Sequence, residues 1–275
     1  MEAFEAAMWA GRLTSGATPL AVAQAARAMP APDGDERLGS LLLTAYTRRL
    51  TGSYASAVVG LGRALAAYAD ELRGQPELKW DGLAWNAAGE LLDFGTYYAT
   101  AREWARVSRE QGALATLPGA LSALAWCEVL AGRITAAEGL VDEAEEIARA
   151  TGAPATPGAS EIVKLGILCW RGDERIARPV ADSVAAEAVA RGQGLGLTIV
   201  EFMLTILELG LGRYEEARLH GLRVFEEDAL WFGPSALADT VEAAVRSGDN
   251  DGARAALIAS ASAPTRAAPR GREAC

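Results

Sequence analysis

The stretch Leu209-Gly-Leu-Gly-Arg-Tyr-Glu-Glu-Ala217 contains the pattern that decides the fold. Gly212 is followed by a tyrosine two positions later and an alanine five positions later, and Gly-x-x-x-x-Ala recurs along the chain. The expected turn glycines follow one another at intervals of 36 to 43 residues and are Gly52, Gly95 in a variant form, Gly132, Gly172, Gly212 and Gly248. A second glycine series falls about midway between them, at Gly74, Gly112, Gly152 and Gly192. This spacing indicates an internal repeat of about 40 residues.

Each repeat is expected to contain two helices. Strand signals are nearly absent, and Ala, Leu, Glu and Arg dominate the segments between the glycines. Glycine ends helices because it adopts positive φ without steric cost. Helices this short bury their apolar faces only by stacking on neighbours, so the sequence predicts an all-α fold of stacked helical hairpins, an α-solenoid.

Small residues recur where the helices of a hairpin should cross. They lie seven residues before, five after and twelve after the turn glycine, as Ala45, Ala57 and Ala64 around Gly52 and as Ala125, Ala137 and Ala144 around Gly132. A methyl group lets two helices approach to about 8 to 9 Å. We expect a helical lead-in and loop over 1–34, a repeat array over 35–261, and a disordered tail over 262–275, which has two prolines and no apolar periodicity.

Composition excludes several classes of function. The chain of 275 residues has 26 Lys+Arg against 36 Asp+Glu, a net charge of −10, which disfavours direct binding to nucleic acid or anionic membranes. Its one histidine, His220, excludes zinc sites built on a histidine pair, and neither Lys79 nor Lys164 follows the glycine spacing of a phosphate-binding loop. Cys127 and Cys169 belong to no CxxC motif and are expected to be buried free thiols. We expect a cytoplasmic protein without metal or cofactor.

The chain also resembles known families. The spacing of turn glycine, tyrosine and alanine is similar to that of the tetratricopeptide (TPR) repeat, which implies a right-handed superhelical α-solenoid of about six TPR-like hairpins. Whole phrases over roughly residues 1–260 resemble the repeat region of actinobacterial LuxR-type large ATP-binding transcriptional regulators, namely Phe4–Leu13, Val141–Pro154, Leu209–Ala217 and Asp239–Gly248. The resemblance implies a non-enzymatic sensor and protein-interaction module, without the ATPase and helix-turn-helix parts of those regulators.

The tetratricopeptide register places candidate binding residues on a concave face. Positions thirteen, ten, six and three before each turn glycine would line it, with aromatic rings beside small residues such as Gly82 and Gly119. We assign a groove for a small-molecule effector or a protein partner to Tyr46, Trp85, Trp126, Phe202, Ile206 and Glu242. The alternative is that these aromatic rings pack between adjacent repeats.

Two other functions remain open from the sequence. One is an enzyme with an acidic pocket on the helical scaffold, using Glu201, Glu208 or Glu242. The other is a truncated gene product without a role of its own, whose exposed last repeat favours aggregation or a homodimer. His220, with Glu216 and Arg223 nearby on its expected helix, is interpreted as a surface or groove-edge histidine.

Overall fold

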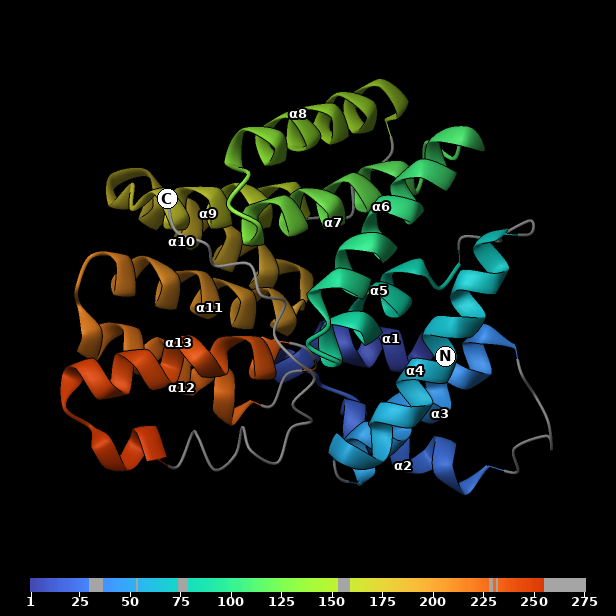
Figure 1. The fold of residues 1–275 in the computed structure, drawn as a ribbon, viewed down its shortest axis with the longest axis horizontal. Helices are drawn as coiled ribbons and strands as arrows, with labels where there is room; N and C mark the ends of the chain where they lie inside the picture. The colour runs from blue at the N-terminus through green and yellow to red at the C-terminus, as the bar shows by residue number, and fades with distance from the viewer. Residues whose placement is uncertain are drawn as a thin grey trace.

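The computed structural model describes residues 1–29, 37–52, 54–73, 79–152, 159–227, 230 and 232–254, and their regular secondary structure is helical throughout (Figure 1). The elements are α1 (Glu2–Ala10), the 3₁₀ helix η1 (Gly11–Leu13), α2 (Pro19–Ala28), α3 (Leu38–Thr51), α4 (Tyr54–Arg73), α5 (Asp81–Glu90), α6 (Phe94–Glu110), α7 (Leu117–Leu130), α8 (Ile134–Thr151), α9 (Ala159–Arg171), α10 (Glu174–Arg191), α11 (Gly194–Gly210), α12 (Tyr214–Glu226) and α13 (Phe232–Ser247). The predicted all-α class is confirmed. The expected tail at 262–275 and most of the expected loop at 29–34 lie outside the described residues.

Consecutive helices pack in pairs. The hairpins α3–α4, α5–α6, α7–α8, α9–α10 and α11–α12 follow one another along the chain, and α13 packs against α12. First helices of successive hairpins also contact each other, as α3 does α5, α7 does α9, α9 does α11 and α11 does α13. Neighbour-on-neighbour packing of this kind fits an α-solenoid in general terms (Figure 1).

The turns inside four hairpins repeat every 40 residues. Each contains one residue with positive φ, and these residues are Leu92, Gly132, Gly172 and Gly212. Three turns between hairpins are spaced in the same way, at Gly112, Gly152 and Gly192. The internal repeat therefore has a period of 40 residues over this part of the chain.

The prediction that Gly95 forms a hairpin turn is wrong. Asp93 caps α6 by accepting a hydrogen bond from the backbone N–H of Thr96 at 3.1 Å, so the helix begins before Gly95. The chain turns instead at Leu92, with φ of 51°. Gly52 does lie at the turn between α3 and α4, but its φ of −132° is negative, unlike the φ of the later turn residues. Positions counted back from the turn therefore shift by three residues in the α5–α6 hairpin.

Alanine does mark the helix crossings in the hairpins α3–α4 and α7–α8. The side chains of Ala45, Ala57, Ala64, Ala125, Ala137 and Ala144 are completely buried. In the α5–α6 hairpin, counted from Leu92, the same three positions hold Trp85, Tyr97 and Trp104. The rings of Trp85 and Tyr97 stack with centroids 4.6 Å apart. This hairpin is thus filled by aromatic rings where α3–α4 and α7–α8 have methyl groups.

The array curves until its N-terminal segment meets α11, and Figure 1 shows α1 near the centre of the molecule. A Cβ atom on Gly11 would lie 2.9 Å from the backbone nitrogen of Leu195, and one on Gly194 would overlap the carbonyl oxygen of Ala10. Two glycines therefore permit close backbone contact between segments far apart in sequence. Arg12 adds an ion pair to Glu227 at 2.7 Å. We call this contact the seam.

Candidate functional site

An apolar cavity of about 140 Å³ lies inside the curve of the array. Seven helices contribute to its wall, namely α1, α5, α6, α7, α9, α11 and α13. Four of the chain's seven tryptophans line it, so aromatic surface is concentrated here. The lining residues are Trp9, Gly82, Trp85, Asn86, Trp104, Gly119, Ser122, Ala123, Trp126, Ala159, Ile162, Val163, Leu195, Ile199, Met203 and Phe232. Convergence of rings and small residues from many elements is typical of a ligand pocket.

Glycines set the positions of the cavity's rings. A Cβ atom on Gly166 would lie 2.8 Å from Cζ3 of Trp126, so the indole of Trp126 lies directly against the backbone of α9. Gly82 faces Cη2 of Trp104, which would be 3.9 Å from a Cβ there. Larger residues at Gly82 or Gly119 would fill space that is now open. The small residues beside the rings therefore create the cavity.

Among the described residues, none that lines the cavity has an ionisable side chain. Apart from the indole N–H groups, its polar side chains are those of Asn86 and Ser122. The Ser122 hydroxyl donates a hydrogen bond to the carbonyl oxygen of Pro118 at 2.9 Å. Burial of a charge without a partner is costly, so the cavity favours an uncharged occupant.

The structure brings two of the six predicted groove residues, Trp85 and Trp126, together at the cavity. Phe202 lies behind the wall, with its ring centroid 6.4 Å from that of Trp126 and 6.1 Å from that of Phe232. Its ring packs between neighbouring helices, as the alternative interpretation of the aromatic residues holds.

The other three predicted groove residues do not line the cavity. Tyr46 is fully buried, and its hydroxyl donates to the carbonyl oxygen of Leu83 at 2.7 Å, which joins α3 to α5. Ile206 is buried in α11. Glu242 is half exposed and pairs with Arg246 at 2.9 Å on α13.

Sequence reasoning missed several lining residues for two reasons. Trp9 lies in the segment treated as a lead-in, and no local pattern indicates that this segment reaches α11. Asn86 was missed because the turn was placed at Gly95, and Trp104 because the groove was assigned only to first helices, whereas Trp104 lies on α6. Counting from Leu92 puts Asn86 six residues before the turn, at the position equivalent to Trp126. The 40-residue period of the other turns is the signal that finds it.

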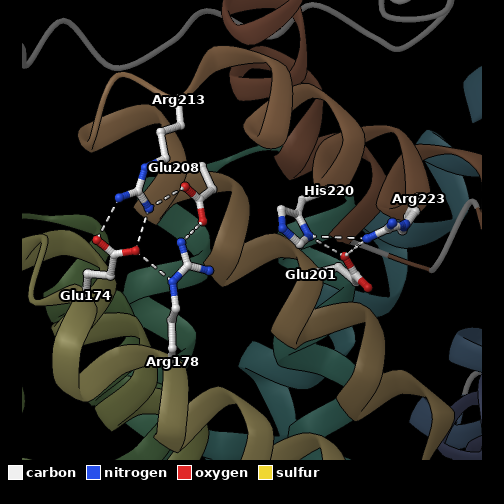
Figure 2. Close-up of polar contacts among 7 residues, drawn as sticks. All are labelled: Glu174, Arg178, Glu201, Glu208, Arg213, His220 and Arg223. Carbon is white, nitrogen blue, oxygen red and sulfur yellow. Dashed lines mark hydrogen bonds and ion pairs between the residues drawn. The ribbon is translucent and has the colours of Figure 1, made fainter.

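The acidic residues considered for catalysis form ion pairs, and none of them lines the cavity. Figure 2 shows the ion pairs of Glu201 and Glu208. The carboxylate of Glu208 is 1% exposed and lies between the guanidinium groups of Arg178 and Arg213. Glu174 pairs with the same two arginines, at 2.8 Å from Nε of Arg178 and 2.9 Å from Nη2 of Arg213. Hydrogen bonds from Arg213 and Arg178 lower the pKa of Glu174 to about 2. This four-residue clasp joins α10, α11 and the start of α12.

His220 pairs with Glu201, not with Glu216 (Figure 2). Its Nδ1 lies 2.6 Å from Oε2 of Glu201, and Nη1 of Arg223 lies 3.1 Å from the same oxygen. Burial alone would raise the pKa of Glu201, but hydrogen bonds from His220 and Arg223 outweigh it and lower that pKa below 4.5. The histidine is mostly buried at the α11–α12 contact, where it supports an ion pair.

The cysteines are unsuited to nucleophilic chemistry. Cys127 and Cys169 are buried and form no disulfide. Burial raises the pKa of each thiol to about 12, so both stay protonated near neutral pH. Within the described ranges, no group of three His, Cys, Asp or Glu side chains is arranged to hold a metal ion.

Comparisons with known proteins give no family assignment. No protein-family model matches the chain, and no curated protein shows significant similarity to it. In the described part of the chain, every helix is too short or too polar to span a bilayer.

Proposed function

We propose that the chain is a non-enzymatic sensor module that binds a small apolar effector in the tryptophan-lined cavity. One observation carries the proposal: seven helices, from α1 to α13, place four indole rings and several small residues around one uncharged space. An effector there contacts helices from α1 to α13, which are far apart in the sequence. Its binding energy therefore acts on how the helices are arranged, as a sensor requires.

The size of the cavity limits the effector. Engineered apolar cavities of about 150 Å³ stay dry and bind benzene. A cavity of about 140 Å³ in this wall therefore suits a molecule with one aromatic ring, which gains by leaving water and by contact with the indoles.

The resemblance to LuxR-type regulators supplies the wider setting of the proposal. We infer a right-handed, TPR-like array from the resemblance; the 40-residue spacing of the turns supports a repeat of helical hairpins. The module would pass effector binding to protein partners, the ATPase and helix-turn-helix parts of such a regulator, in the cytoplasm. The net charge of −10 supports leaving direct contact with nucleic acid to those partners.

The acidic residues support a non-enzymatic role. Glu201, Glu208 and Glu242 each pair with an arginine, and none of them lines the cavity. A general acid or base has to reach a bound substrate. These carboxylates instead join helices to one another or lie at the surface.

Toluene is a suitable probe for the proposed site. Saturable binding should raise the melting temperature of the protein, because the ligand binds the folded state alone. The variant Ile162→Trp should abolish this shift by filling the cavity from α9. Trp170→Ala is the matched control on the same helix, since Trp170 is 48% exposed and outside the cavity, and it should keep the shift.

Other outcomes would count against the effector site. Circular dichroism establishes that Ile162→Trp is folded, and Ala123→Leu on α7 provides a second, smaller filling variant. Absence of toluene binding by the wild-type protein, or equal binding by both filling variants, overturns the effector cavity. A shift seen only with an isolated ATPase or helix-turn-helix part of a LuxR-type regulator would make the chain an interaction scaffold instead.

A further inference from the structure

Asn86 is the unusual member of the cavity wall. It lies on α5, six residues before Leu92, and the equivalent positions before the next three turns hold Trp126, Gly166 and Ile206. An amide thus stands where the three following repeats place a tryptophan, a glycine and an isoleucine. Nothing in the 40-residue pattern of helix packing requires a polar group at this position.

The side-chain amide of Asn86 makes no hydrogen bond to any residue that the structure describes. Its neighbours along the wall are mainly tryptophans and aliphatic side chains. The amide is only partly buried and still reaches water, and an apolar ligand that displaces this water would leave it without a hydrogen-bond partner. Asparagine carries both an acceptor oxygen and an NH₂ donor. A ligand can therefore pair with it either by donating a hydrogen bond to the oxygen or by accepting one from the NH₂ group.

Ser122, the other polar residue of the wall, has a different role. Its hydroxyl proton is engaged by the carbonyl oxygen of Pro118, one turn earlier on α7. Asn86 is therefore the lining side chain that can both donate to and accept from a ligand. Carboxylate, phosphate and ammonium groups find no opposite charge on the lining residues that the structure describes, so entry would cost them their hydration without compensation.

We propose that the cavity takes an uncharged aromatic molecule of one ring with a single hydroxyl or carbonyl group, which pairs with the amide of Asn86 while the ring packs against the indoles. The inference rests on the proposed function and specifies the ligand class of the same site. The amide distinguishes such ligands from purely apolar ones, because a ligand without the polar group leaves Asn86 without a hydrogen-bond partner.

Phenol and toluene test this inference, because they match in shape and differ in one hydroxyl group. Their dissociation constants are measured by calorimetry for the wild-type protein and for Asn86→Leu, which keeps the side-chain size and removes the amide. The ratio of the toluene to the phenol constant should fall about tenfold in Asn86→Leu, since phenol loses its partner and toluene gains an apolar one. Asn250→Leu, at an exposed asparagine, should leave the ratio unchanged.

The outcomes separate this inference from the proposed function. If both probes bind and Asn86→Leu leaves their ratio unchanged, the role of Asn86 is overturned and the effector cavity stands. If neither probe binds the wild-type protein, both are overturned. Benzoate, the charged relative, should bind at least about tenfold more weakly than phenol, and equal binding would overturn the uncharged ligand class. Asn86→Ala serves as a second variant if Asn86→Leu does not fold.

Discussion

Leu92 occupies a backbone conformation that suits glycine. Its φ is 51°, and the equivalent turn residues 40, 80 and 120 positions later are glycines with φ of 69° to 74°. A side chain in this region costs about 1–2 kcal/mol in contact with its own backbone. Leu92 is 40% exposed, so it recovers only part of that cost by packing.

We therefore predict that Leu92→Gly stabilises the protein by about 0.5–1 kcal/mol, after the entropy cost of a glycine in the unfolded chain. Denaturant unfolding measures the difference. Gly132→Leu is the reverse substitution and should cost about 1 kcal/mol, because its Cβ would meet no neighbouring atom and only the backbone is strained. A loss of stability in Leu92→Gly would show that packing of the leucine outweighs strain.

The sequence predicted much of the fold and less of the cavity, and Leu92 shows why. Turn glycines reveal a repeat wherever glycine is present, so the helical class and most turns follow from local spacing. A leucine forced into positive φ by its neighbours leaves no such signal. Because the turn lies three residues earlier than predicted, Asn86 was not assigned to the groove. Trp9 was missed because it reaches the cavity through the seam, a contact between segments far apart in sequence. Trp126 was found because it lies six residues before the correctly placed turn Gly132, whereas Trp85 was assigned from Gly95 and lies seven residues before the actual turn at Leu92.

Glu201 should make the free energy of unfolding depend on pH in the acidic range. Its pKa is lowered in the folded protein, so its ionised form stabilises the fold above the ordinary value of 4.5, and this contribution is lost as the pH falls through 4.5 toward the folded-state pKa. Glu201→Gln should cost about 1 kcal/mol at pH 7 and progressively less below pH 4.5. Unfolding free energies from pH 3 to 7 test this, with Glu242→Gln as the exposed control. A difference that does not vary with pH would contradict the role of the charge.

At the level of helices, the same polar contact joins two different pairs of hairpins. Glu208 on α11 meets Arg178 from α10 and Arg213 from the following turn. Eighty residues earlier, Glu128 on α7 meets Tyr98 from α6 and Arg133 from the following turn. A buried carboxylate near the end of one helix thus connects the helix before it to the helix after it.

We predict that Glu208→Ala destabilises the protein by about 1–3 kcal/mol. The carboxylate is buried, but both arginines are about 40% exposed and can return to water, which keeps the cost below that of breaking a fully buried pair. Glu174→Ala removes the carboxylate at the rim of the same clasp and should cost less. Thermal unfolding shows which variant loses more stability. An equal or larger loss for Glu174→Ala would mean that the exposed carboxylate contributes at least as much to the clasp as the buried one.

At the level of the whole molecule, the seam holds α1 against α11 and keeps Trp9 in the cavity wall. Gly194→Val should displace α1, because any side chain there overlaps the carbonyl oxygen of Ala10 and the backbone nitrogen of Leu13. We expect hydrogen exchange of the α1 amides to rise at least about tenfold while α7 and α9 stay protected. Affinity for toluene should fall, since one wall is lost.

Gly210→Ala is the control for the seam variant. Gly210 lies on the same helix as Gly194, and a Cβ atom there meets nothing within 4 Å. It should leave exchange in α1 and toluene binding unchanged. Slow exchange in α1 of Gly194→Val would show that the segment is held by contacts other than the backbone approach of the two glycines.

The seam also determines when the cavity first exists during synthesis. Gly11 and Gly194 are 183 positions apart, and at about 5–20 residues per second a ribosome needs roughly 10–40 s to pass from one to the other. During that interval α1 can already place Phe4 against Tyr46, since their rings pack 5.4 Å apart, but α11 has not yet been made. Hairpins form on the ribosome as they emerge, whereas the chamber around Trp9 needs a chain complete beyond Phe232. An effector that binds there therefore acts only on chains whose synthesis has passed Phe232.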